Sequence, residues 1–313
     1  RTADSGATWS KVLNKGVSYI LPKPGNPDIW YAASYDYWNQ SQVYISLDAG
    51  VTWNQQSSFV YSQNWITLST TSADTNYLAI THSTNKELWE SNDGGNTINF
   101  KSIIPVNEVF QISGINKNIM YTGELDVYKS TDAGKTWKHI GLEASRHISD
   151  IIIHPNNPDI FYVTVQGAQY GPSMQRGVYR TQDGGTNWQR VLYVDDITGA
   201  SSLSMDMNNP RILYASMWQH QRYPWIMESG GDTSGLYKST DGGSTWKQMK
   251  NGLPQAFGKS GISVSRANSN RVFAVIEAEG EKAGVYRSDN AGKKWQQVNK
   301  DSINITRYWY YME

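Results

Sequence analysis

The stretch Ser239-Thr240-Asp241-Gly242-Gly243-Ser244-Thr245-Trp246 recurs in near copies along the whole chain. The copies follow the template S/T-x-D-x-G-x-T-W, called the box below, and occupy residues 2–9, 46–53, 91–98, 130–137, 181–188, 239–246 and 288–295. The template predicts a tight turn, because an Asp carboxylate accepts nearby backbone N–H bonds and Gly tolerates positive φ. We therefore assign structural roles, not catalytic ones, to Asp4, Asp48, Asp93, Asp132, Asp183 and Asp241.

Successive boxes lie 39 to 58 residues apart, which leaves room for four short strands in each repeat. A repeat of this size is typical of a propeller blade. The four strands of a blade are called A to D, and the box forms the C–D turn. In the first full blade we expect strands at 18–22, 29–34, 42–46 and 52–56, and later blades begin near Trp65, Val109, Ile148, Ser201 and Gly261.

The two ends of the chain predict a further, incomplete blade. Residues 8–13 form an expected outer strand after the first box, and residues 303–312 form an expected innermost strand after the last one. The fold class is therefore an all-β, seven-bladed propeller of four-stranded antiparallel blades, with an incomplete closing blade and a single domain over residues 1–313. The chain has no initiator Met and no signal sequence, so we expect a processed or partial chain.

Composition removes several functional classes. The formal net charge is zero, with 28 basic and 28 acidic residues, which argues against a nucleic-acid partner. No apolar run approaches the length of a membrane span. Cysteine is absent, so disulfides do not stabilise the fold, although export is not excluded. The five His residues show no metal-ligand spacing, and we expect neither a metal nor a cofactor.

One end of each blade is the place to look for function. Since neighbouring strands are antiparallel, the B–C loops and D–A connections share one end, and these segments are long and irregular. Aromatic rings stack on sugars, so the expected ligand-binding residues are Trp38, Tyr170, Trp218, Tyr223 and Trp225. The alternative is that Trp218 and Trp225 only pack their own loop. The candidate catalytic carboxylates are Asp36, Asp195, Asp232 and Glu228, although no spacing selects a pair.

The box resembles the Asp-box, or bacterial neuraminidase repeat, of sialidases, glycoside hydrolase family 74 (GH74), sortilin-type receptors and bacterial proteins with YVTN-like repeats. From residue 127 onward the chain looks like large bacterial sortilin-like or glycosyl-hydrolase-like proteins. The matching strings lie at residues 127–132, 137–142, 177–181, 191–195, 235–241 and 309–311. The GH74 resemblance implies two catalytic aspartates in a cleft between two tandem propellers. Arg211-Ile212-Leu213 is the nearest string to the sialidase Arg-Ile-Pro element, and it lies at the opposite end of its blade, which argues against sialidase chemistry.

From these observations we expect a non-catalytic binding module, outside the cell or in the cell envelope, that holds a glycan or a protein through its B–C/D–A end. Two alternatives stay open. One is a GH74-like glycoside hydrolase, which would need a further propeller from a longer parent chain. The other is a structural assembly factor, as in the photosystem assembly propellers that share these boxes.

Overall fold

The computed structural model describes residues 1–4, 8–34, 40–62, 66–82 and 85–300. The chain divides into two compact units. The first unit consists of residues 1–3, 9–140 and 155–158, and the second of residues 4–8, 141–154 and 159–313.

The first unit contains three antiparallel four-stranded sheets. The strands of its first sheet are β1 (Val17–Lys23), β2 (Asn26–Ser34), β3 (Gln40–Ser46) and β4 (Asn54–Ser62). Those of the second are β5 (Ile66–Thr71), β6 (Asp74–His82), β7 (Glu87–Ser91) and β8 (Asn99–Ile103). Those of the third are β9 (Val109–Ile112), β10 (Met120–Gly123), β11 (Val127–Ser130) and β12 (Lys138–His139).

The second unit contains three more sheets of the same kind. The first is formed by β13 (Ile148–Ile153), β14 (Phe161–Val165), β15 (Gly177–Thr181) and β16 (Gln189–Leu192). The second is formed by β17 (Thr198–Met205), β18 (Leu213–Arg222), β20 (Gly235–Ser239) and β21 (Lys247–Met249), and β19 (Met227–Ser229) pairs with β18 alone. The third is formed by β22 (Ser260–Val264), β23 (Val272–Ile276), β24 (Gly284–Ser288) and β25 (Gln296–Asn299), with a short 3-10 helix at Gly280–Lys282.

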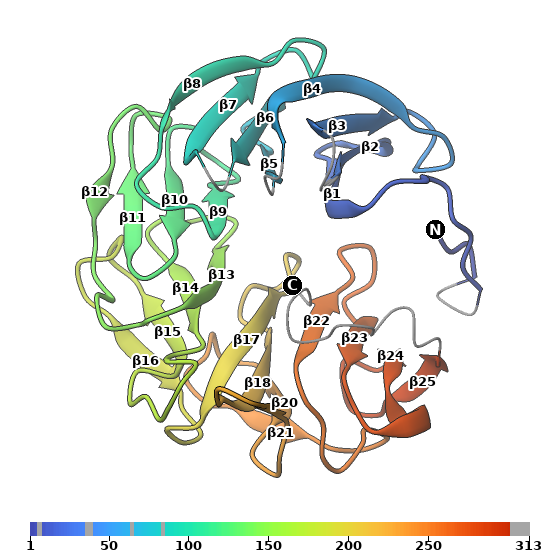
Figure 1. Cartoon of the computed structure of the whole chain (residues 1–313), viewed down its shortest axis with the longest axis vertical. Helices are drawn as coiled ribbons and strands as arrows, with labels where there is room; N and C mark the ends of the chain where they lie inside the picture. The colour runs from blue at the N-terminus through green and yellow to red at the C-terminus, as the bar shows by residue number, and fades with distance from the viewer. Residues whose placement is uncertain (5–7, 35–39, 63–65, 83–84, 301–313) are drawn as a thin grey trace. The chain divides into compact units, whose positions relative to one another are not determined.

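Within each sheet the main strands pair in chain order, as can be followed along the labels of Figure 1. This up-and-down order confirms an all-β fold built from four-stranded antiparallel propeller blades. It also places the turns as predicted, since every box of residues 46–295 lies between the third and fourth main strands of its sheet.

The prediction of seven blades is wrong for the described residues, which form six sheets. The expected outer strand at residues 8–13 is not a strand, and Trp9 is 53% exposed. Since an extended segment leaves its backbone groups unpaired until a neighbour supplies partners, one strand does not make a blade by itself. The expected innermost strand at residues 303–312 lies outside the described residues.

The box turn has the same hydrogen bonds in copy after copy. In the sixth copy Oδ1 of Asp241 accepts bonds from the Ser239 hydroxyl (2.8 Å) and the Thr245 amide (2.9 Å). Its Oδ2 accepts the Thr245 hydroxyl (2.6 Å). Two successive residues then take positive φ, at Gly242 (71°) and Gly243 (84°). These bonds to the charged form lower the pKa of Asp241 to about 2.

The hydrophobic core lies between neighbouring sheets of a unit, because each sheet buries apolar side chains on both faces. Tyrosines of the second strand connect one sheet to the box of the next. The Tyr31 hydroxyl donates to the Gly94 carbonyl (3.3 Å), and the Tyr162 hydroxyl donates to the Gly242 carbonyl (2.8 Å). The boxes therefore stabilise contacts between sheets as well as their own turns.

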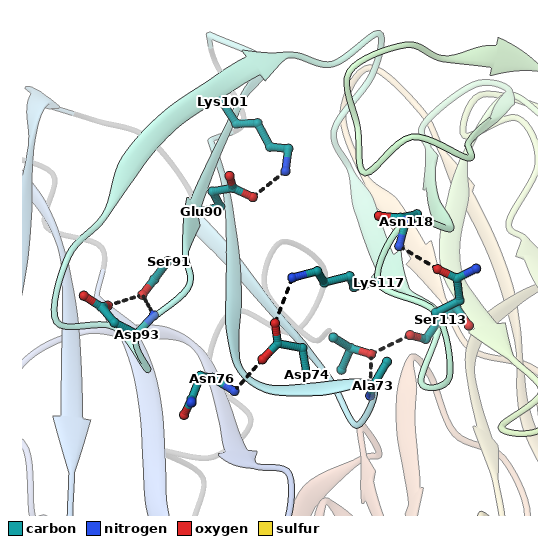
Figure 2. A network of polar contacts seen from close by, with 12 residues as sticks. Ala73, Asp74, Asn76, Glu90, Ser91, Asp93, Lys101, Ser113, Lys117 and Asn118 are labelled. Carbon is teal, nitrogen blue, oxygen red and sulfur yellow. Dashed lines mark hydrogen bonds and ion pairs between the residues drawn. The ribbon is translucent and has the colours of Figure 1, made fainter.

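Polar contacts also join the second and third sheets of the first unit. Figure 2 shows the Lys117 ammonium directed at the Asp74 carboxylate, at a distance of 2.8 Å. Beside it the Thr71 hydroxyl donates to the Ser113 carbonyl (2.7 Å). These contacts lie at the A–B turns, the end of the blades that carries short, repetitive connections, and they indicate that this end supports the fold.

Candidate functional site

The loops of the second unit form one connected surface, here called the loop surface. It comprises the B–C loops 166–176, 219–234 and 277–283 and the D–A connections 193–197 and 250–259. Backbone bonds join these loops across the sheets: the Arg222 amide donates to the Gln169 carbonyl (2.7 Å) and the Ser173 amide to the Asp196 carbonyl (2.7 Å). The Gly258 amide donates to the Glu277 carbonyl (2.8 Å).

The most prominent part of the loop surface is a β-hairpin. Its first strand is the end of β18, which extends to Arg222, and its second strand is β19. The Tyr223 amide donates to the Ile226 carbonyl (2.8 Å) and closes the turn. Trp225 is therefore at the tip of a paired structure, where few residues can move independently.

A buried guanidinium fixes the base of this hairpin. Arg176 has no exposed surface and His220 is 2% exposed. Nη1 of Arg176 lies 3.0 Å from Nδ1 and 3.3 Å from Nε2 of His220, and because Nδ1 faces the Trp218 carbonyl (3.2 Å), Nε2 is the nitrogen that can accept. Nη2 donates to the Ala168 and Gly171 carbonyls at 2.7 and 3.2 Å. One side chain thus connects the B–C loop of one sheet to the hairpin of the next.

A second chain of contacts starts at Trp218. Its indole stacks on the His220 ring at 4.1 Å between centroids and donates to the Ser229 hydroxyl (2.9 Å). That hydroxyl donates to Oε2 of Glu277 (2.6 Å), which also accepts the Lys259 amide (2.7 Å). Trp218 is only 3% exposed, so its prediction as a ligand-binding residue is corrected: it packs its own loop.

Burial and nearby positive charges keep two histidines, His147 and His220, in the neutral form. Burial, with a contribution from the Arg176 charge, lowers the pKa of His220 to about 3. Burial and the Lys259 charge lower the pKa of His147 to about 4. Burial lowers the pKa of Arg176 to about 10, opposed by Asp195 and Asp196, and the guanidinium stays charged. A neutral imidazole can accept the Arg176 hydrogen bond, whereas a protonated one cannot.

Three predicted aromatic residues remain partly or largely exposed. Trp225 is 81% and Tyr170 is 72% exposed, and Tyr223 stacks on Trp225 at 5.9 Å with 19° between the rings. Tyr170 belongs to the loop that Arg176 ties to the hairpin. Large exposed aromatic side chains on a hydrogen-bonded hairpin and its neighbouring loop are a surface on which a sugar ring can stack. Trp38 lies outside the described residues.

The candidate carboxylates are spread over the same loops. Glu228 and Asp232 are exposed on β19 and just after it, and Asp195 is half-buried, with its Oδ1 accepting the Ile197 amide (3.0 Å). Asp36 lies outside the described residues. Within the described part of the chain, no group of three or more His, Cys, Asp and Glu side chains could hold a metal ion. No helix there is long and apolar enough to cross a membrane.

Comparisons with known proteins bear on both family and function. The family model Sortilin-Vps10, described as "Sortilin, neurotensin receptor 3", matches residues 125–284. An oligoxyloglucan-reducing end-specific xyloglucanase of Emericella nidulans is 23% identical in an alignment of 248 residues, and the alignment covers 67% of this chain. The chain spans 29% of the length of that enzyme.

Solved structures share the fold. The GH74 xyloglucanase of Xanthomonas campestris matches with a TM-score of 0.71 and 18% identity, over 93% of this chain and 46% of its own. YCF48 of Cyanidioschyzon merolae matches with a TM-score of 0.62 and 12% identity, over 90% of this chain and 85% of its own. At such identities, the likeness shows the fold alone.

These comparisons contradict the prediction of a non-catalytic binding module. The curated relatives that match are xyloglucanases, which favours the glycoside hydrolase alternative. The box motif did not separate the two functions, because it specifies turns common to both kinds of protein.

Proposed function

Because this chain belongs to the Sortilin-Vps10 family and its curated relatives are xyloglucanases, we propose that it is a propeller component of a GH74-type glycoside hydrolase. Its substrate is a neutral plant β-glucan of the xyloglucan class. Such polymers lie outside cells, so the protein works outside the cell or in the cell envelope.

The observation that carries this proposal is the exposed aromatic hairpin of the loop surface. Trp225 and Tyr223 stack on each other at the tip, and Arg176 holds the base of the hairpin from below. A polymer that lies across this surface contacts the aromatic rings. Glu228 and Asp232 lie a few residues after Trp225 in the sequence. Ordered rings bind at low entropic cost, because little motion is lost when the sugar docks.

The chemistry requires two carboxyl groups. One donates its proton to the glycosidic oxygen, and the other, as carboxylate, activates water on the far side of the sugar ring. In an inverting enzyme the two groups are about 6.5–9.5 Å apart. The candidates of this chain are Asp36, Asp195, Asp232 and Glu228. A further propeller of a longer parent protein would supply the opposite wall of the cleft, as the GH74 resemblance implies.

The test has two readouts, release of reducing ends from xyloglucan and retardation of the protein in a xyloglucan-containing native gel. The proposal expects retardation with this chain and release when the parent protein is intact. Trp225→Ala should abolish retardation. Asp→Asn or Glu→Gln changes are made singly at the four candidates, and the change at a catalytic carboxyl group should reduce release and leave retardation intact. Phe100→Ala is a matched control, because Phe100 is an exposed aromatic residue of β8, outside the loop surface.

Two results would contradict the proposal. One is the absence of both release and retardation with xyloglucan. The other is retardation that is unchanged in Trp225→Ala, since the polymer would then bind elsewhere. If the intact parent protein bound xyloglucan but released no reducing ends, the proposed glycan binding would stand and the proposed catalytic role would be wrong.

A further inference from the structure

A notch separate from the aromatic hairpin opens beside strand β15. Its volume is about 310 Å³, and it is lined by Leu142, Glu143, Ala144, Ser145, Gln175 and Tyr179. Ligand pockets in proteins have volumes of roughly 300–1,000 Å³, so this one is large enough for a small group such as a single sugar ring.

The backbone that forms one wall of the notch is strained. Leu142 and Arg146 have φ values of 62° and 66°. Most other non-glycine residues with positive φ in the described chain are alanines in the box turns. A left-handed conformation is costly for a bulky residue, and it persists only where the surroundings impose it. The Ser145 amide donates to the Leu142 carbonyl (3.0 Å) and fixes this wall.

The other wall is equally well held. Tyr179 is hydrogen-bonded to the Arg190 guanidinium, which also donates to the Met174 carbonyl and stacks on Tyr193 at 3.9 Å. Gln175 precedes Arg176, the residue that anchors the loop to His220. Both walls are therefore held by contacts within the protein, the first by the Ser145–Leu142 backbone bond and the second by the contacts of Arg190.

The chemistry of the lining selects the kind of ligand. Leu142, Ala144 and the Tyr179 ring offer apolar surface, while Glu143 and Gln175 are exposed and offer hydrogen-bonding groups. Glu143 is the one charged lining residue, so its carboxylate disfavours anions, and a single carboxylate is a poor cation site. A ligand with an apolar face and hydroxyl groups at its edges fits both parts of this lining.

We propose that the notch binds one neutral glycosyl unit, which packs on Tyr179 and Leu142 and hydrogen-bonds to Glu143 and Gln175. This inference takes the class of sugar from the proposed function, and it does not depend on catalysis. The notch would hold a sugar unit of the polymer away from the aromatic hairpin, and so add a second attachment point to the same chain.

Titration of the ¹⁵N-labelled protein with cellobiose, D-glucose and D-xylose tests this proposal. We expect amide shifts at residues 142–145 and 175–179, with millimolar affinity. Glu143→Gln should weaken binding by about tenfold, as expected for loss of a charged hydrogen-bond acceptor. Ala144→Trp should abolish these shifts by filling the notch, whereas Trp225→Ala should leave them unchanged.

The proposal is overturned if no probe shifts these amides at about 50 mM, a concentration well above a millimolar Kd. It is also overturned if the shifts survive in Ala144→Trp or are confined to residues 170 and 222–226. Gln175→Ala, an exposed position, provides a second test if Ala144→Trp does not fold. Reducing-end release is measured separately, so failure of the notch and failure of the hydrolase proposal are distinguishable.

Discussion

The Arg176 guanidinium lies 3.0 Å from Nδ1 of His220, and both side chains are buried beneath the aromatic hairpin. This contact determines where Trp225 is held, because it ties the loop that carries Tyr170 to the hairpin that carries Trp225. The function proposed above depends on it indirectly, since neither residue needs to touch a sugar.

The first prediction concerns Arg176→Met, which keeps the apolar stem and removes the donors. The Ala168 and Gly171 carbonyls and the His220 imidazole would each lose a partner. We expect the free energy of unfolding to fall by about 2–4 kcal/mol, as for several buried polar groups left unsatisfied. Urea denaturation measures this. Arg211→Met, at an exposed position, should change the stability by less than about 0.5 kcal/mol.

A second prediction follows from the neutral histidines. Their folded-state pKa values, about 3 for His220 and about 4 for His147, lie below the unfolded value of about 6.5. The unfolded chain therefore binds more protons between pH 6.5 and pH 4, and stability falls as the pH falls through this window. The loss is on the order of 2 kcal/mol per histidine by pH 4.5.

Melting temperatures measured from pH 7.5 to pH 4.5 test this dependence. The charged groups that act on the two imidazoles are Arg176 and Lys259, and Asp195 and Asp196 act on the Arg176 charge. His220→Gln, which cannot titrate, should flatten the profile. An unchanged profile in this variant would show that His220 does not carry the effect.

A third prediction separates the box turns from the loop surface. Asp241→Ala removes the acceptor of three hydrogen bonds and should lower the melting temperature, with little effect on xyloglucan binding. Below pH 3.8 the boxes should weaken further, since the pKa of Asp241 is depressed to about 2 and its protonation removes the charged acceptor. Asp232→Ala, at an exposed loop position, should leave the melting temperature unchanged.

The seventh box allows the opposite test, a change that should raise the melting temperature. Asn290 accepts bonds from the Ser288 hydroxyl (2.9 Å) and the Lys294 amide (2.8 Å), but lysine at position 294 cannot supply the hydroxyl bond that Thr245 makes in the sixth box. The double change Asn290→Asp with Lys294→Thr should therefore raise the melting temperature. No increase, measured by differential scanning calorimetry, would mean that the bond from the seventh-position Thr adds nothing at this turn.

The box motif predicted more of the fold than of the site. Turns, strand order and blade starts follow from the box spacing and from alternating apolar runs, since both are local properties. The buried Arg176–His220 contact joins residues 44 positions apart, and no local sequence pattern indicates it. The nearly continuous apolar run from Leu213 to Trp218 was the available signal that β18 extends to Trp218 and buries it. Asp36 and Trp38 lie outside the described residues and stay predictions.

In the proposed function, the exposed aromatic hairpin binds a β-glucan of the xyloglucan class. The most direct measurement is the dissociation constant for xyloglucan oligosaccharides of the wild-type chain and of Trp225→Ala, by isothermal titration calorimetry. We expect at least about tenfold weaker binding in the variant, at unchanged melting temperature, because Trp225 is 81% exposed and supports no core. Equal affinity of the two proteins would contradict it.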